Sequence, residues 1–203
     1  MEGQFGCSYE RPARHIREYL TALRPLLRGE YVEYRGQTLT AVGQSAAPGA
    51  TPPSVLVSAV GPAMLRIAGE LADGTVTVWT TPETVADYIG PTLTRAASAA
   101  GRPVPRIVAT VVASVTADVG GVRQQVADQM GFAAQFASYR SMFDRQRMSG
   151  LHETVVAGDE TAVARAVRRY AAAGVTELLV SPVGSEKDVM RTIGLLASVR
   201  DET

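Results

Sequence analysis

The chain has 203 residues, a mass of 21.5 kDa and 20 basic against 20 acidic side chains, which give a formal net charge of +0. This balance argues against a nucleic acid or an anionic membrane as partner, and no apolar run approaches the roughly 20 residues of a membrane-spanning helix. Cys7 is the single cysteine, which excludes an internal disulfide and is typical of a reducing compartment, so we expect one soluble, cytoplasmic domain over residues 1–203.

A helix and a hairpin are predicted before residue 54. Pro12 suits the first position of a helix whose apolar residues recur at helical spacing up to residue 27, with a last turn that is kinked or separate at Pro25 and an end at Gly29. Residues 30–40 alternate weakly around a central glycine, which indicates a small hairpin. A loop rich in Gly, Pro, Ala and Ser follows, and we place no site in this part of the chain.

From residue 54 onward, continuous apolar runs alternate with helical patterns, which is typical of strands buried on both faces of a parallel sheet. Gly74 is expected to cap the first of these helices and Gly90 to interrupt the second. Because no antiparallel hairpin breaks the alternation, the pattern predicts an α/β fold of right-handed βα units. The predicted strands cover residues 54–60, 75–79, 106–115 and 176–183, and the predicted helices cover residues 62–74, 81–101, 122–148, 159–174 and 185–199.

The stretch SVLVSAVGPAMLRIAGELADGTVTVW places a Gly-Pro pair at the first hinge between strand and helix. If Gly61 is the N-cap and Pro62 the first helical residue, the amides of Gly61, Ala63 and Met64 are unpaired at the positive end of the helix dipole. Such a hinge can hold a phosphate, and the Ser58 hydroxyl is placed to add a donor. The alternative is an ordinary turn that uses Gly and Pro for geometry alone.

A second candidate stands at the end of the next strand. Trp79 is the single tryptophan and can stack on a planar ring, with the hydroxyls of Thr80 and Thr81 beside it. The alternative is a packing role for Trp79 and a helix cap at Thr81. A third candidate, the start of the last helix, is favoured as structural, because Ser185 and Asp188 are spaced as a capping box.

The usual catalytic motifs are missing from the sequence. His15 and His152 are far apart and lack the cysteine or carboxylate spacing of a zinc site, so no metal is predicted. No GxSxG, P-loop or GxGxxG motif occurs. Asp73 reads as structural, and the arginine-rich residues 138–147 favour a solvated helical face over an anion-binding lid.

Five segments together resemble, in order, the later part of bacterial luciferase-like oxidoreductases, and especially the branch that uses the deazaflavin coenzyme F420. The most specific elements are the Gly-Pro hinge followed by AGELADG and the helix that precedes the last strand. The segments are ERPARHIREYLTALRPLL, SVLVSAVGPAMLRIAGELADGTVTVW, AASAAGRPVPRIVA, ASYRSMFD and AGDETAVARAVRRYAAAGVTELLVSP.

The resemblance implies an F420-dependent oxidoreductase that transfers a hydride between reduced deazaflavin and a small organic substrate. An FMN-dependent luciferase-like monooxygenase is one alternative, and a non-catalytic fragment that binds a flavin or deazaflavin, or that oligomerises, is another. The resemblance assigns the cofactor phosphate to the first hinge and the pocket wall to the second strand end. The residues implied are Ser58, Ala59, Val60, Gly61, Pro62, Trp79, Thr80 and Thr81.

The resemblance also implies a partial TIM-type (β/α)8 barrel that lacks the N-terminal strands. Relatives complete the barrel, whereas this chain is expected to begin after the fourth strand, so no catalytic residue can be carried over. Four strands leave two unpaired sheet edges and an unfilled interior. We expect another copy of the chain, rearranged N-terminal elements or an upstream segment to cover them, with a homo-oligomer as the favoured state.

Overall fold

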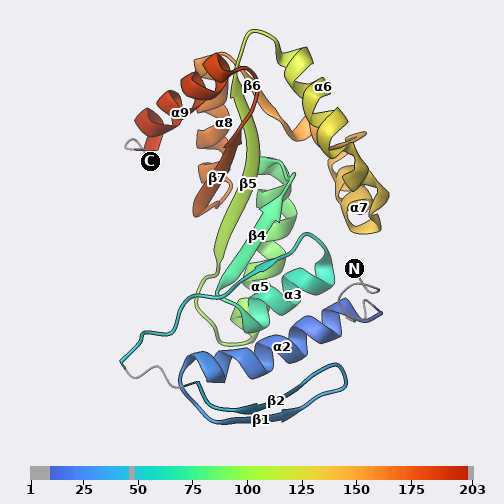
Figure 1. The fold of residues 1–203 in the computed structure, drawn as a ribbon, viewed down its shortest axis with the longest axis vertical. Coiled ribbons are helices and arrows are strands. Elements are labelled where there is room, and N and C mark those ends of the chain that lie inside the picture. Colours follow the sequence, from blue (N-terminus) through green and yellow to red (C-terminus); the bar gives the residue numbers. More distant parts are fainter. Residues whose placement is uncertain (1–9, 46–48, 201–203) are drawn as a thin grey trace.

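The computed structural model describes residues 10–45 and 49–200, and Cys7 lies outside this part of the chain. It contains a five-stranded parallel sheet with helices packed behind it, and a helix with a two-stranded hairpin below (Figure 1). None of the helices in the described part is long and apolar enough to cross a membrane.

The N-terminal helix and hairpin are as predicted, with one difference. Helix α2 (Pro12–Leu27) begins at Pro12, and Gly29 follows its end with a φ of +76°. The helix continues through Pro25 as one element, because a proline there removes a single amide donor near the C-terminal end. Strands β1 (Val32–Arg35) and β2 (Thr40–Gly43) pair antiparallel.

The hairpin is fastened to α2 by the buried carboxylate of Glu18. Its oxygens accept hydrogen bonds from the amides of Gln37 (3.1 Å) and Thr38 (2.8 Å) and from the Thr38 hydroxyl (2.7 Å). These hydrogen bonds, above all those from Thr38, lower the pKa of Glu18 to about 2. A Cβ at Gly36 would lie 2.2 Å from Glu18 Oε2, so the turn needs glycine at this position.

The sheet confirms the predicted parallel strands and adds a strand that sequence analysis missed. Strands β3 (Leu56–Ser58), β4 (Gly74–Val78), β5 (Arg106–Val115) and β7 (Glu177–Pro182) pair parallel in that order. The missed strand, β6 (Val156–Gly158), pairs with the last three residues of β5. Apart from β6, each strand of this sheet pairs parallel with the one that follows it in the chain, which is the strand order of a barrel wall.

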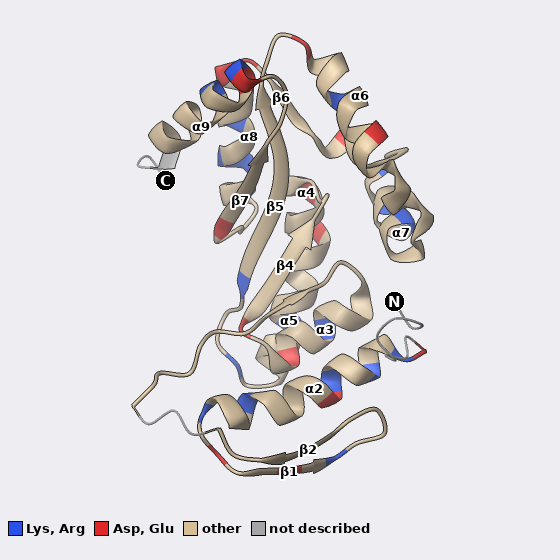
Figure 2. Cartoon of the chain, in the orientation of Figure 1, with Lys and Arg blue, Asp and Glu red and all other residues tan. Residues whose placement is uncertain are grey.

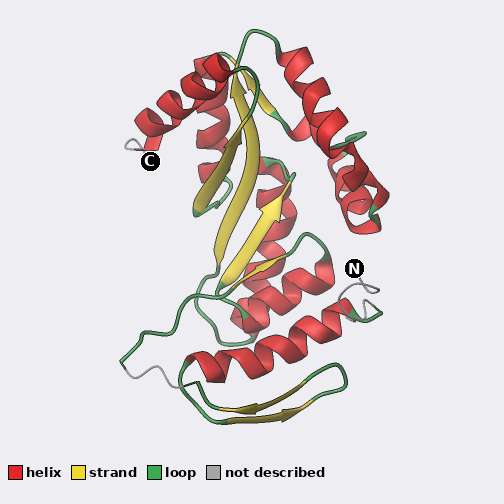
Figure 3. Cartoon of the chain, viewed as in Figure 1, coloured by secondary structure: helices red, strands yellow, loops and turns green. Residues whose placement is uncertain are grey.

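Helices follow the strands as the alternation predicts, but the stretch predicted over residues 122–148 is divided near residues 131–136 (Figure 3). The predicted break in the second helix is a π-helical segment: the Gly90 amide donates to Val85 O, and Pro91, which has no amide hydrogen, follows. The elements are α3 (Pro62–Leu71), α4 (Pro82–Thr84), η1 (Val85–Ile89), α5 (Gly90–Ala99), α6 (Val119–Met130), η2 (Gly131–Gln135), α7 (Ala137–Gln146), η3 (Leu151–Thr154), α8 (Glu160–Ala172) and α9 (Glu186–Arg200).

The prediction that Gly74 caps the first helix is wrong. Helix α3 ends at Leu71 with Ala72 as its C-cap, and Gly74 is the first residue of β4. Gly74 stands opposite Arg106 in the sheet, and a Cβ there would lie 2.2 Å from the Arg106 carbonyl oxygen. Close approach of two strands, rather than a left-handed turn, therefore requires this glycine.

Helices α3 and α5 pack against one face of the sheet, whereas the opposite face is partly exposed. Val57, Thr75 and Ile107 stand in register and are buried, and Val57 and Ile107 pack into the core with residues of α3 and α5. On the opposite face, Val78 and Thr110 are half-buried, and their neighbour in register, Leu179, is 58% exposed. In Figure 1 this face of β4, β5 and β7 is turned to the viewer, and no helix crosses it.

Candidate functional site

The first hinge has the backbone geometry predicted for it. Gly61 is the N-cap of α3, with φ −92° and ψ 157°, and Pro62 is the first helical residue. The Gly61 carbonyl oxygen accepts from the Leu65 amide at 3.0 Å. No side chain caps this helix, and within the described residues the amides of Gly61, Ala63 and Met64 have no hydrogen-bond partner.

The hinge is open to a ligand. A Cβ placed on Gly61 would meet no atom within 4 Å, and Ser58 is exposed at the end of β3. Ala59, by contrast, is buried and fixed to β4 by its amide, which donates to Val76 O at 3.1 Å. Three unpaired amides therefore stand at the positive end of a ten-residue helix, a geometry that favours negative charge.

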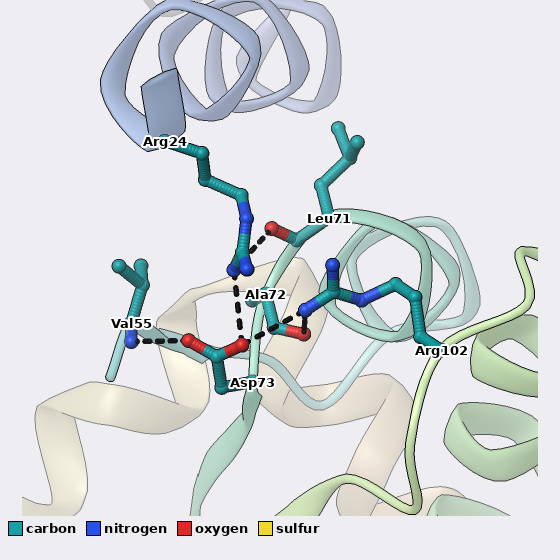
Figure 4. A network of polar contacts seen from close by, with 6 residues as sticks. All are labelled: Arg24, Val55, Leu71, Ala72, Asp73 and Arg102. Atoms are coloured by element: carbon teal, nitrogen blue, oxygen red, sulfur yellow. Dashed lines mark hydrogen bonds and ion pairs between the residues drawn. The ribbon is translucent and has the colours of Figure 1, made fainter. Parts of the chain in front are cut away.

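The other end of α3 is held by Asp73 (Figure 4). Its carboxylate accepts from the Val55 amide at 2.8 Å, from Arg24 at 3.1 Å and from Arg102 at 2.8 Å. Arg24 also donates to Leu71 O, where α3 ends. The network joins α2, the chain entering β3 and the loop after α5, as the structural reading of Asp73 predicts.

The charge of Asp73 suits this role. Partial burial acts to raise the pKa of Asp73, but the Val55 amide and the guanidinium groups of Arg24 and Arg102 outweigh it and lower the pKa. The carboxylate therefore stays ionised at neutral pH and holds both arginines.

The second candidate, residues 79–81, lies at the end of the neighbouring strand β4, at the same edge of the sheet as the hinge. We call these three residues the rim. Trp79 follows β4 with a φ of +54°, a conformation that residues other than glycine seldom adopt. Its indole packs edge-on against Tyr139, with ring centres 4.8 Å apart, and lies 6.3 Å from Phe143. Both partners belong to α7, so the ring is in contact with this helix.

Gln146, which sequence analysis missed, clamps this rim. Its Oε1 accepts from the Thr81 amide at 2.7 Å, and its Nε2 donates to the Trp79 carbonyl oxygen at 3.0 Å. The two hydrogen bonds join residues more than 60 positions apart in the chain. No local pattern marks such a glutamine, because the partners are brought together by tertiary packing alone.

The two threonines of the rim are engaged inside the protein. The Thr80 hydroxyl is buried and lies 2.9 Å from the Thr77 hydroxyl, while the Thr80 carbonyl accepts from the Tyr170 hydroxyl at 2.7 Å. Burial raises the pKa of Tyr170, which keeps this donor protonated. Thr81 caps α4, as predicted, by accepting from the Thr84 amide. The hydroxyls of Thr80 and Thr81 are therefore engaged within the protein, and a binding role for these two residues stays a prediction.

The remaining candidates are structural in their contacts. Ser185 and Asp188 form the predicted capping box at the start of α9. Arg145, in the arginine-rich helix α7, stacks on Tyr88 with its guanidinium carbon 3.8 Å from the ring centre. Arg145 and Tyr88 line a cavity of about 370 Å³, which Thr81 also borders.

The comparisons agree with this architecture. The model of the luciferase-like monooxygenase family matches residues 1–193. An F420-dependent secondary alcohol dehydrogenase, solved with an F420–acetone adduct, is 17% identical with a TM-score of 0.70, and the match covers 98% of this chain and 66% of that one. The coenzyme F420-dependent tetrahydromethanopterin reductase of Methanopyrus kandleri is 23% identical with a TM-score of 0.64. This match covers 91% of this chain and 61% of the reductase.

A third structure contains FMN. The oxygenating constituent of 3,6-diketocamphane monooxygenase from the CAM plasmid of Pseudomonas putida is 15% identical with a TM-score of 0.56, covering 82% of this chain and 55% of that one. The chain thus spans less than two thirds of the length of these relatives. Its α/β fold with a parallel sheet matches their barrels, and the family match over residues 1–193 shows that the chain belongs to the luciferase-like monooxygenase family.

Proposed function

We propose that this chain supplies the phosphate-binding side of an F420-dependent oxidoreductase that transfers a hydride between reduced deazaflavin and a small organic substrate. The observation that carries the proposal is the hinge, where the amides of Gly61, Ala63 and Met64 are unpaired at the N-terminus of α3. Two of the similar structures are F420-dependent enzymes.

The residues present fit a phosphate group. The hinge has free donors, no capping side chain and open space at Gly61. The deazaflavin, when bound, supplies the carrier that takes or gives a hydride. The hinge amides and the exposed Ser58 would hold its phosphate, and Trp79 would line the pocket beside it.

FMN is the second candidate cofactor. Its phosphate would meet the same amides, and one similar structure contains FMN. The hinge amides would contact the phosphate that both cofactors carry and would not contact the flavin or deazaflavin ring. A further contact must therefore distinguish the two cofactors.

The open sheet face bears on how a complete site is formed. Strand β3 pairs on one side with β4, and β7 pairs on one side with β5, so each has a free edge within the described residues. Two copies related by a two-fold axis could pair β7 of one with β3 of the other, giving eight parallel strands from β3, β4, β5 and β7 of each copy. We propose this homo-oligomer as the form that binds the small substrate.

A thermal-shift titration with F420 and with FMN tests the proposed function. A ligand at 100 times its dissociation constant stabilises the folded protein by about 2.7 kcal/mol, which raises the melting temperature by several degrees. Stabilisation by F420 above that by FMN supports the proposal, and stabilisation by FMN alone favours the second candidate. A melting temperature unchanged by either cofactor would contradict both.

A further inference from the structure

A cavity of about 370 Å³ lies between the helical segments that follow β4 and the end of α7, and nothing in the proposed function uses it. Thr81 of the rim borders this cavity, whereas no residue of the hinge, 58–64, lines it. Pockets that take small molecules are commonly about 300–1,000 Å³, so a small ligand has room here. The residues that matter are Glu83, Asp87, Tyr88, Arg145, Gln146 and Arg147.

The cavity lining carries charges of both signs, and each sign comes from a different part of the chain. Glu83 of α4 and Asp87 of η1 supply the acidic groups, and Arg145 and Arg147 at the end of α7 supply the basic groups. Figure 2 shows this division, with acidic positions beside the α4 label and basic positions on α7. A ligand that complements such a lining carries a negative group and a positive group.

The charges of the lining do not neutralise one another. Glu83 pairs with Arg169 of α8, which lies outside the lining. Asp87 and Arg147 are exposed, and among residues 10–45 and 49–200 neither side chain has a hydrogen-bond or ion-pair partner. Opposite charges therefore stand around the cavity without contact, which leaves them available to a ligand.

Tyr88 holds Arg145 in one orientation. The guanidinium carbon of Arg145 lies 3.8 Å from the centre of the Tyr88 ring. This stacking occupies a face of the planar guanidinium and leaves the N–H groups at its edge, which have no acceptor in the described part of the chain. An oriented guanidinium edge matches the two oxygens of a carboxylate.

Arg147 has a backbone conformation that is costly for an arginine. It ends α7 with a φ of +57° and a ψ of 40°, and its amide donates to Asp144 O at 3.1 Å. Helices commonly place glycine at this position, because a residue with a Cβ is strained in the left-handed region. The helix end alone therefore does not account for arginine. Strained residues of this kind cluster at ligand sites, and the Arg147 side chain lines the cavity.

We propose that this cavity binds a free α-amino acid, whose carboxylate contacts Arg145 and Arg147 and whose ammonium group contacts Asp87. Half-buried Met148 also lines the cavity and offers an apolar contact to the side chain of the ligand. The site is separate from the hinge and does not depend on the cofactor proposed there.

The bound amino acid would also influence the rim. Gln146 stands between the two arginines in the chain and lines the same cavity, and its side chain bonds to the Thr81 amide and to the Trp79 carbonyl oxygen. A carboxylate held by Arg145 and Arg147 lies next to this clamp. Binding is therefore expected to change the fluorescence of Trp79.

The experiment titrates the full chain with each of the proteinogenic amino acids, and measures the dissociation constant by calorimetry and the emission of Trp79. The amino acid that binds best is then compared with its N-acetyl form, which lacks the ammonium group, and with its carboxamide form, which lacks the carboxylate. The variants are Arg147→Gly and Asp87→Asn. Arg165→Gln, which removes an exposed arginine of α8, is the control.

At least one amino acid is expected to bind and to change the Trp79 emission. Arg147→Gly, Asp87→Asn and each blocked form of the ligand should weaken binding about tenfold, the effect of one charged hydrogen bond. Arg165→Gln should bind like the unmodified chain. Arg147→Gly should keep or raise the melting temperature, because glycine suits the left-handed position, so its weaker binding is not a loss of folding.

Failure of every amino acid to bind would overturn the proposal. Equal binding of the blocked forms, or undiminished affinity in both variants, would overturn it as well. Binding that leaves the Trp79 emission unchanged would overturn the link between the cavity and the rim.

Discussion

Single residues fix the hinge from both ends of α3. Gly61 leaves the first turn uncapped and open, while Asp73 ties the chain after the last turn to Arg24 and Arg102. The carboxylate is partly buried and paired on several sides, so removing it would leave two arginines without their acceptor. The free donors of the hinge are therefore presented on a support that is polar and specific.

Glu18 gives the hairpin a dependence on pH. Its folded pKa of about 2 lies below the ordinary value of 4.5, so its contribution to stability is complete above pH 4.5 and is lost as the pH falls toward 2. Glu18→Gln should lower the melting temperature at pH 7, because an amide group would meet the backbone donors of Gln37 and Thr38. It should also flatten the fall of melting temperature between pH 5 and 2.

The matched control is Glu33→Gln, which neutralises an exposed glutamate in the same hairpin that pairs with Arg35. Exposed pairs contribute about 0–1 kcal/mol, so little change is expected. Circular dichroism melts across this pH range measure both variants. An acid profile of Glu18→Gln that follows the unmodified chain would show that the carboxylate does not anchor the turn.

At the scale of elements, α7 closes on the end of β4. Tyr139 and Phe143 pack on the Trp79 ring, and Gln146 bonds to the backbone on both sides of Thr80. The left-handed backbone of Trp79 costs on the order of 1–3 kcal/mol and persists because the surroundings hold it. The α7 helix is therefore a support for this rim.

Gln146→Leu should loosen the rim. It removes two hydrogen bonds and leaves the Thr81 amide and Trp79 carbonyl partly buried without them, at a cost of about 1–3 kcal/mol. Because Trp79 is the single tryptophan, its fluorescence reports this site directly, and a red shift with a lower melting temperature is expected. Gln125→Leu, on the exposed side of α6, is the control. Identical spectra for the two variants would refute the clamp.

Local chemistry explains which elements could be predicted. Pro12 and Pro62 at the first positions of their helices, and the cap at Thr81, act within one helical turn, and all three are where the sequence predicts them. Strand β6 was missed because three residues carry no period, and their pairing depends on β5. Gly74 was misassigned because a close strand contact and a helix cap both favour glycine.

In the candidate site, too, features set by the local sequence could be predicted and features set by distant contacts could not. The hinge could be predicted because its donors are backbone amides freed by the rules of helix ends. The burial of the Thr80 hydroxyl and the role of Gln146 could not, since both depend on contacts with segments distant in the chain. A cavity lined by residues of α2 and α3, Arg66 among them, likewise depends on the packing of these two helices.

For the whole molecule, the open sheet face predicts association. Leu179 is 58% exposed on that face, so Leu179→Asp should shift the proposed homo-oligomer to monomer. Light scattering during size exclusion, at tens of micromolar protein, should give about twice the 21.5 kDa of the chain before the change. Val104→Asp, at an 84% exposed site before β5, should leave the mass unchanged. A monomer for the unmodified chain would contradict the arrangement.

The most direct test of the account is the affinity of F420 for Gly61→Asp, measured by titration beside the unmodified chain. A carboxylate at Gly61 enters open space and would face the phosphate, so binding should weaken about a hundredfold or more while the fold persists. Gly194→Asp, an exposed glycine of α9 that also faces open space, should bind like the unmodified chain. Undiminished affinity in Gly61→Asp would show that the phosphate is not held at the hinge.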